Sequence, residues 1–214
     1  MANDSKIYID ATSIGEGGGL VLLEYLASYL EKHKADYCII GNKRLLANTQ
    51  IIKSRLMIPS LWKKAILYTA GLGRTIYFCN RGPLLPNKYA KVYVHSEYIT
   101  LSLKDILKLK SKNTRKIVHF LIYIINWISA KLSNNKFFVQ TDHMQQKLAN
   151  NRNIESEILP FFPDLLLPEI KSIKYDLCYI SYPWRHKNHS LLFDILSNKQ
   201  NIDLPLKIAV TIPD

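Results

Sequence analysis

The stretch KIYIDATSIGEGGGLVLLEYLASYL, residues 6–30, holds the three parts of one α/β unit in succession. Its first residues, 6–12, are mostly apolar and predict a buried strand. A glycine-rich loop over residues 15–19 follows, and leucines then recur at helical spacing from residue 20 to residue 30. The order strand, glycine loop, helix is typical of parallel α/β sheets, so it predicts that the chain begins with such a sheet.

The alternation of apolar strands and helices continues along the chain. Further strands are predicted at residues 35–41, 51–60, 74–80, 91–98, 136–141 and 154–164. Helices are predicted at residues 61–73, 101–132 and 142–151, the last of them opened by Asp142 as its cap. Because the strands are apolar on both faces, we expect an α/β fold with a doubly wound, mostly parallel sheet.

Two prolines interrupt this rhythm between residues 161 and 174, where we place a linker. Residues 1–160 then form the first domain. Residues 175–214 supply a strand, a helix and one more strand, which is too little for an independent core. We therefore expect them to be the incomplete beginning of a second α/β domain.

Composition and charge limit the function classes. The chain has 214 residues, of which 48% are hydrophobic, so the sequence excludes a disordered protein. Its formal net charge of +12 indicates an anionic partner, either a phosphate ligand, an acidic membrane surface or nucleic acid; a basic surface that serves only solubility is the alternative. Cys38, Cys79 and Cys178 lie in apolar runs without zinc spacing, which predicts buried free thiols in a reducing compartment.

The segment RKIVHFLIYIINWISAKL, residues 115–132, is strongly apolar. It is shorter than the roughly 20 residues of a membrane-spanning helix, and His119 and Asn126 interrupt it. Two interpretations remain: a helix inside the protein core, or a helix that touches a membrane surface. Lysines and an arginine at both ends of the segment would suit contact with acidic lipid headgroups.

The glycine loop is the first candidate site. The loop places three glycines, Gly17, Gly18 and Gly19, before a helix whose amino end favours negative charge. It follows the carboxyl end of a strand, where α/β sheets bind their ligands. Leu20 stands where the dinucleotide fingerprint has its third glycine, and no acidic residue ends the second strand, so a nicotinamide cofactor is not expected. A flexible turn without a ligand is the alternative.

Two further candidate sites follow. His95 closes a predicted strand, so its imidazole is expected at the same edge of the sheet, where it could take a proton from a hydroxyl. A structural histidine is the alternative. Arg185 and Lys187 precede the last predicted helix, where two cations beside free N–H groups would receive a diphosphate. A solvated charged turn is the alternative there.

Four stretches resemble segments of the GT-B glycosyltransferases, in the retaining group that builds bacterial polysaccharides and lipopolysaccharide O-antigens. Residues 7–30 resemble the family's first strand, glycine loop and first helix, and YVHSEYI, 93–99, resembles the strand end that holds a histidine in the acceptor domain. FFVQTDHMQQKLANN, 137–151, is similar to the segment before the domain linker. YDLCYISYPWRHKNHSLLFDIL, 175–196, resembles the first strand and helix of the donor domain.

This resemblance implies a Rossmann-like acceptor domain and a metal-independent transferase that moves a sugar from a nucleotide-sugar to a lipid-linked or growing polysaccharide acceptor. It places Gly17, Gly18 and Gly19 near the donor phosphates and His95 near the transferred sugar. Arg185 and Lys187 would neutralise the diphosphate leaving group, because preplaced cations favour the charge that develops there. No cofactor is implied beyond the nucleotide-sugar substrate.

The chain departs from the family because the donor domain's glutamate pair and glycine-rich loop have no counterpart before Asp214. We therefore expect this chain alone to have little transferase activity. We expect the protein to lie in the cytoplasm, peripheral to the inner face of the plasma membrane. A non-catalytic half-enzyme, paired with a chain that supplies the missing domain, is one alternative. A nucleic-acid-binding module is another, but the cations are scattered and no motif for nucleic-acid binding occurs, so we do not expect nucleic acid as a partner.

Overall fold

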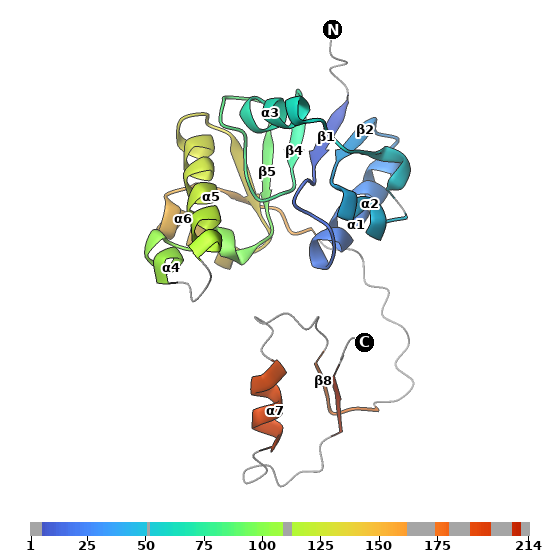
Figure 1. Ribbon diagram of the computed structural model, residues 1–214, viewed down its shortest axis with the longest axis vertical. Helices are drawn as coiled ribbons and strands as arrows, with labels where there is room; N and C mark the ends of the chain where they lie inside the picture. Colours follow the sequence, from blue (N-terminus) through green and yellow to red (C-terminus); the bar gives the residue numbers. More distant parts are fainter. Residues whose placement is uncertain are drawn as a thin grey trace. The chain divides into compact units, whose positions relative to one another are not determined.

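A computed structural model describes residues 6–50, 52–108, 113–161, 174–179, 189–197 and 207–210. It divides the chain into two compact units, Met1–Pro163 and Asp164–Asp214. Figure 1 shows the elements of each unit, coloured along the sequence from blue at the N-terminus to red at the C-terminus. The first unit is a sheet with helices packed on it, and it contains the glycine loop and His95.

The first unit is built on a seven-stranded sheet with the order β3-β2-β1-β4-β5-β6-β7. All of its strand pairs are parallel. The strands are β1 (Ile7–Asp10), β2 (Tyr37–Ile40), β3 (Leu56–Met57), β4 (Arg74–Tyr77), β5 (Lys91–Val94), β6 (Lys136–Val139) and β7 (Glu157–Ile158). The order reverses between β1 and β4, so the expected α/β fold with a parallel, Rossmann-like sheet is confirmed.

The helices are α1 (Gly18–Lys32), α2 (Lys43–Asn48), α3 (Leu61–Thr69), α4 (Leu103–Lys108), α5 (Asn113–Lys131) and α6 (Asp142–Arg152), with short 3₁₀ turns at Lys53–Arg55 and Glu97–Thr100. Side-chain oxygens cap four of them, because a helix leaves its first N–H groups unpaired: Asn42 caps α2, Ser60 caps α3, Ser102 caps α4 and Thr141 caps α6. The prediction that Asp142 caps α6 is therefore wrong, since Thr141 accepts the bond from the Met144 N–H and Asp142 lies in the first turn.

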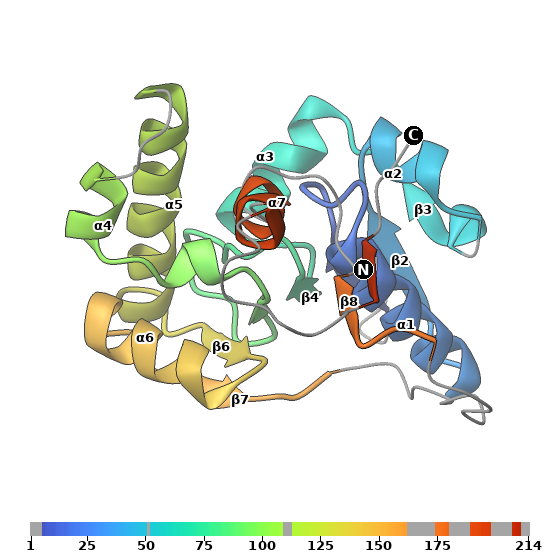
Figure 2. The same cartoon turned by 90° about the horizontal axis from the view of Figure 1, so that it is seen from below.

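Two apolar clusters hold helices to opposite faces of the sheet. On one face, Leu23 and Ala27 of α1 pack with Ile9 and Ile39. Leu67 of α3, with Met144 and Leu148 of α6, packs on the other face. Figure 2 shows α1 and α3 on opposite sides of the strands. Burying both faces explains why the strands are apolar throughout rather than alternating.

The structure shortens most of the predicted strands and divides one predicted helix. The strand expected at 51–60 is reduced to Leu56–Met57, and that expected at 154–164 to Glu157–Ile158. The strand expected at 91–98 ends at Val94, and a 3₁₀ turn begins at Glu97. The helical stretch expected at 101–132 consists of α4 and α5. The interpretation of α5 as a helix inside the core is wrong for its apolar side, because large side chains such as Ile117 and Leu121 are exposed.

In the second unit, the described elements are β8 (Leu177–Tyr179), α7 (His189–Ser197) and β9 (Ile208–Val210), with β8 and β9 paired in parallel. All three cysteines are free thiols, but only Cys79 is buried, while Cys38 is half-buried and Cys178 is exposed. The prediction of burial is wrong for Cys178 because a sheet of two short strands offers little surface to cover its side chain.

Candidate functional site

The glycine loop ends in a backbone conformation that only glycine adopts easily. Gly17 is the N-cap of α1, with φ 68° and ψ −154°. An L side chain is strained at such a positive φ, so residue 17 must be a glycine for α1 to begin there. No acidic residue lies in the first turn of α1, and the positive end of the helix dipole is left uncompensated by its own side chains. The turn is therefore suited to an anionic ligand.

The first turn of α1 lies against His95. A Cβ atom added to Gly19 would be 3.3 Å from His95 Cε1, whereas one added to Gly18 would meet nothing within 4 Å. The absence of a side chain at Gly19 is thus what lets the helix approach the imidazole. The structure brings together the glycine loop and His95, two of the three groups that the sequence singled out. Arg185 and Lys187 lie outside the residues that the structure describes.

Backbone groups fix the imidazole of His95. Its Nε2 atom lies 3.1 Å from the carbonyl oxygen of Phe78. A carbonyl only accepts hydrogen bonds, so Nε2 carries the hydrogen and Nδ1 holds the basic lone pair of the neutral ring. Burial lowers the pKa of His95 below its ordinary value, although the bond to the Phe78 carbonyl opposes this shift. The ring is therefore neutral at neutral pH, with Nε2 as a donor.

Asn80 holds the loop that carries His95. It follows β4 and has a left-handed backbone, with φ 64°. Its Oδ1 atom accepts hydrogen bonds from the N–H of His95, at 2.7 Å, and from the N–H of Ser96, at 3.0 Å. The Nδ2 atom of Asn126 on α5 in turn donates to the carbonyl of Asn80, at 3.0 Å. The ends of β4 and β5 are thereby tied together at the carboxyl edge of the sheet.

A buried carboxylate lies at the point where the strand order reverses. Asp10 ends β1 with no exposed surface. Its Oδ1 accepts from the N–H and the hydroxyl of Thr12, and its Oδ2 accepts from Cys79 Sγ at 2.9 Å. Burial raises the pKa of the Cys79 thiol well above its ordinary value, and the charge of Asp10 adds to the shift. Cys79 is thus a protonated donor to Asp10 rather than a nucleophile.

Arg81 adds a cation to the same edge. Its guanidinium lies over the ring of Tyr68, with Cζ 4.0 Å from the ring centroid, and Nη2 donates to Thr12 Oγ1 at 3.3 Å. Its Nε atom is buried and has no hydrogen-bond partner. Thr12 therefore stands between the guanidinium of Arg81 and the carboxylate of Asp10. The Nε–H of Arg81 is therefore left without an acceptor in the described part of the chain.

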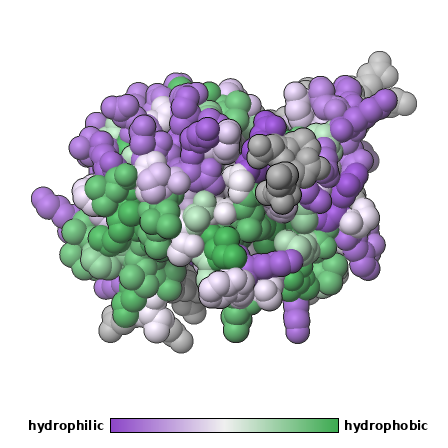
Figure 3. Space-filling view, turned by 90° about the horizontal axis from the view of Figure 1, so that it is seen from above, coloured by the Kyte–Doolittle hydropathy of each residue, from purple (hydrophilic) through white to green (hydrophobic). Residues whose placement is uncertain are grey.

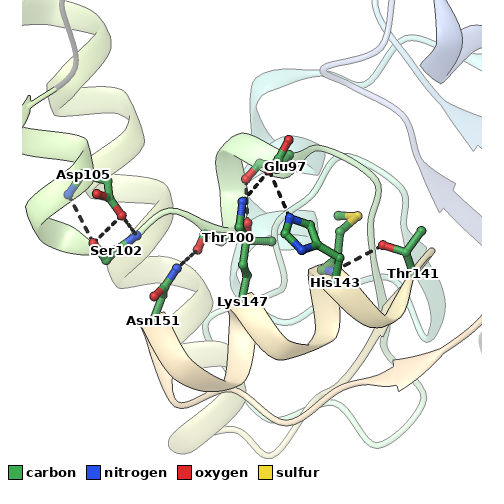
Figure 4. Close-up of polar contacts among 9 residues, drawn as sticks. Glu97, Thr100, Ser102, Asp105, Thr141, His143, Lys147 and Asn151 are labelled. Atoms are coloured by element: carbon green, nitrogen blue, oxygen red, sulfur yellow. Dashed lines mark hydrogen bonds and ion pairs between the residues drawn. The ribbon is translucent and has the colours of Figure 1, made fainter.

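A second polar cluster holds the segment that follows His95. Figure 4 shows His143 and Lys147 reaching from α6 toward Glu97 in the 3₁₀ turn. Further along, Asn151 Nδ2 donates to the carbonyl of Thr100 at 2.9 Å. Hydrogen bonding to Lys147 lowers the pKa of Glu97, so its carboxylate is charged at neutral pH. These contacts fix the chain between β5 and α4 and do not reach the imidazole.

The sequence analysis missed Asp10, Thr12, Asn80 and Arg81. One signal was available for Asp10, since a single carboxylate in an apolar strand needs a polar partner. Among the described residues, no three His, Cys, Asp or Glu side chains gather as metal ligands. The helices in the described part of the chain include none with the length and apolar character needed to cross a bilayer.

No family model matches the chain, and no curated protein or solved structure matches it.

Proposed function

We propose that this chain belongs to a GT-B glycosyltransferase and forms the acceptor side of its active site. The reaction would move a sugar from a nucleotide-sugar to a lipid-linked or growing polysaccharide acceptor. The observation that carries the proposal is the contact between Gly19 and His95 at the carboxyl edge of a parallel sheet. It supports the proposal because a positive helix end suits a phosphate, and the free Nδ1 lone pair of a neutral imidazole can accept a hydrogen bond from a sugar hydroxyl beside it.

Each group has a role in the proposed reaction. The amino end of α1, free of side chains at Gly18 and Gly19, would face the diphosphate. His95 would bind and orient the transferred sugar. As the bond from the sugar carbon to the diphosphate oxygen breaks, negative charge builds on the diphosphate, and Arg185 and Lys187 would stabilise it. The buried Arg81 beside Thr12 would bind an anionic group of the acceptor.

A binding titration tests the proposal. Calorimetry with uridine and guanosine diphosphates and their sugar conjugates, at about 0.1 M and about 0.5 M salt, is expected to show binding of at least one of them. The variants Gly19→Ala and Arg185→Ala should weaken that binding about tenfold or more, because the first crowds the amino end of α1 against His95 and the second removes a cation. Tyr29→Ala is the control, because Tyr29 is 50% exposed in the last turn of α1, at the other end of the helix.

Two results would contradict the proposal. One is tight, salt-sensitive binding of a single-stranded oligonucleotide with no binding of any nucleoside diphosphate, which would favour a nucleic-acid-binding module. The other is diphosphate binding that Gly19→Ala and Arg185→Ala leave unchanged, which would place the ligand elsewhere. Release of nucleoside diphosphate in the presence of a lipid-linked glycan would establish the reaction itself.

A further inference from the structure

Helix α5 buries two polar residues and exposes most of its large apolar residues. Asn126 and Ser129 are fully buried, with 0% of their surface exposed. Asn126 Oδ1 accepts from the N–H of Gly82, and its Nδ2 donates to the carbonyl of Asn80. A Cβ on Gly82 would be 2.1 Å from Ser129 Oγ, so the loop backbone lies directly on the helix. The inner side of α5 thus combines polar groups that satisfy this backbone with Ile122 and Ala130, which pack on the core.

The outer side of α5 carries large apolar side chains in contact with solvent. Ile117 is 57% exposed and Leu121 is 52% exposed. The others on this helix are Val118, Phe120, Ile124 and Trp127. A surface helix of a globular protein normally shows the reverse arrangement, and an apolar patch of this kind marks an interaction site. Figure 3 shows hydrophobic side chains gathered over this side of the first unit. We call these six residues the α5 patch.

The segment that carries the α5 patch has charges of a single sign, although Asp105 on the neighbouring helix α4 directly precedes it. Residues 106–141 contain seven lysines and arginines and no aspartate or glutamate. Lys116 lies in the first turn of α5 and donates to the carbonyl of Leu107, while Lys131 ends the helix and is exposed. Cations thus stand at both ends of an exposed apolar helix, in a pattern typical of helices that lie in the headgroup region of a bilayer.

We propose that the α5 patch docks on an anionic lipid bilayer. Charge complementarity decides between this partner and a second copy of the chain. A symmetric dimer through the patch would bring two sets of like charges together, with no acidic residue from this segment to balance them. Anionic headgroups would instead pair with Lys116 and Lys131 while the apolar side chains enter the acyl boundary. The helix would lie flat along the surface.

The proposal needs no transferase activity, because bilayer binding can be measured without a donor or acceptor. It does connect the bilayer to the site, since Asn126 bonds to the carbonyl of Asn80, whose side chain holds the backbone of His95. A helix resting on lipid would therefore position the loop that carries the imidazole. A lipid-linked acceptor would be held by the same bilayer that α5 binds.

Vesicle flotation tests the proposal on the full chain. Vesicles that mix phosphatidylglycerol with phosphatidylcholine should bind the protein, and raising salt from about 0.1 M to about 0.5 M should weaken binding. The double variant Ile117→Glu and Leu121→Glu should lower the partition coefficient about tenfold or more, because two apolar anchors are lost. Tyr29→Glu on α1, which is 50% exposed, is the matched control and should bind as the unchanged protein does.

Fluorescence identifies the side that touches lipid. With Trp62 and Trp184 replaced by phenylalanine, Trp127 is the remaining tryptophan, and brominated lipids should quench it. Vesicle binding that is unaffected by the double variant, or Trp127 emission that brominated lipids leave unchanged, would overturn the proposal. So would a failure to bind anionic vesicles, and so would a stable dimer in solution that the double variant converts to monomer. That last result would assign the α5 patch to contact between copies.

Discussion

Among single residues, Asn80 has the largest structural role in the candidate site. It combines a left-handed backbone, which asparagine tolerates better than most residues, with an amide oxygen that accepts two backbone N–H groups. Without that oxygen, the N–H groups of His95 and Ser96 would have to find other acceptors in a partly buried loop. The position of the imidazole therefore depends on a side chain that carries no chemistry of its own.

Two substitutions separate the acceptor of Asn80 from its backbone conformation. Glycine and aspartate both tolerate a positive φ, but only aspartate keeps an oxygen in place. We expect Asn80→Gly to lower the free energy of unfolding by about 1–3 kcal/mol, the cost of leaving buried donors unsatisfied. Asn80→Asp should cost clearly less. Urea unfolding followed by circular dichroism measures both values.

The opposite order of these two variants would contradict this account of Asn80. If Asn80→Asp were the more destabilising, the amide N–H₂ group would be the important part of the side chain. Its Nδ2 atom lies 3.2 Å from His95 Nε2 and could donate there only if the ring carried its hydrogen on Nδ1, so this result would also overturn the tautomer assigned to His95. A proton resonance of His95 recorded for each variant would show which of the two contacts fixes the ring.

The residues of the site could be predicted only in part. Gly19 and His95 could be placed together because both follow strands of one parallel sheet, and such strands end at a common edge. Thr12, Asn80 and Arg81 could not, because their partners come from loops whose backbone geometry no periodicity encodes. The succession of strands in the sequence predicts which residues lie at the carboxyl ends of the sheet. Hydrogen bonds within the loops then decide which of their atoms are in contact.

At the scale of elements, the start of α1 is where sequence and site geometry meet most closely. Three successive glycines serve different purposes there. Gly17 supplies a positive φ, Gly19 gives room for the imidazole, and Gly18 has neither requirement. In the sequence this run of glycines suggests only a flexible loop. In the structure the fold can accept a side chain at Gly18 but not, without strain or crowding, at Gly17 or Gly19.

Alanine substitutions distinguish these glycines. Gly18→Ala should leave stability unchanged or raise it by about 0.5–1 kcal/mol, because alanine restricts the unfolded chain and favours the helix. Gly19→Ala should be the less stable of the two by about 1 kcal/mol or more, because its methyl group crowds His95 Cε1. Thermal unfolding of the two variants side by side measures the difference. Equal stability, with an unmoved His95 resonance, would mean that the helix and the imidazole are farther apart than the structure has them.

Elements of the fold were predictable wherever burial dictates a pattern. Apolar runs indicated each strand of the seven-stranded sheet. The central strands are covered on both faces, whereas both residues of the edge strand β7 are exposed. The short helix α2, with the sequence KRLLAN, was missed because six residues are too few to show a helical period. The sequence left the position of α5 open between the core and a membrane surface, because its apolar residues suit either. In the structure its buried contacts are made by Asn126 and Ser129, with Ile122 and Ala130 packed beside them.

For the molecule as a whole, stability depends on pH through several groups, among which His95 and Glu97 lie two residues apart. Burial lowers the pKa of His95 below its ordinary value of 6.5, and hydrogen bonding to Lys147 lowers that of Glu97 below 4.5. Each group binds a proton more readily in the unfolded chain than in the folded one. For each group, stability is lost as pH falls from its pKa in the unfolded chain to its lower pKa in the folded chain; we call this range its pH window. The window of His95 lies below pH 6.5 and is reached first, and that of Glu97 lies below pH 4.5.

The two windows can be separated experimentally. At pH 8 neither state binds a proton at His95, so this residue adds no pH dependence there. As pH falls through 6.5, where the imidazole of the unfolded chain is half protonated, the free energy of unfolding should fall until the folded state takes up its own proton. His95→Gln keeps a donor for the Phe78 carbonyl but cannot titrate. Urea unfolding from about pH 8 to about pH 5 should thus show a smaller decrease for the variant. Parallel curves for the two proteins would mean that His95 is as exposed to water as a free histidine, and the buried imidazole on which the proposed sugar site depends would have to be abandoned.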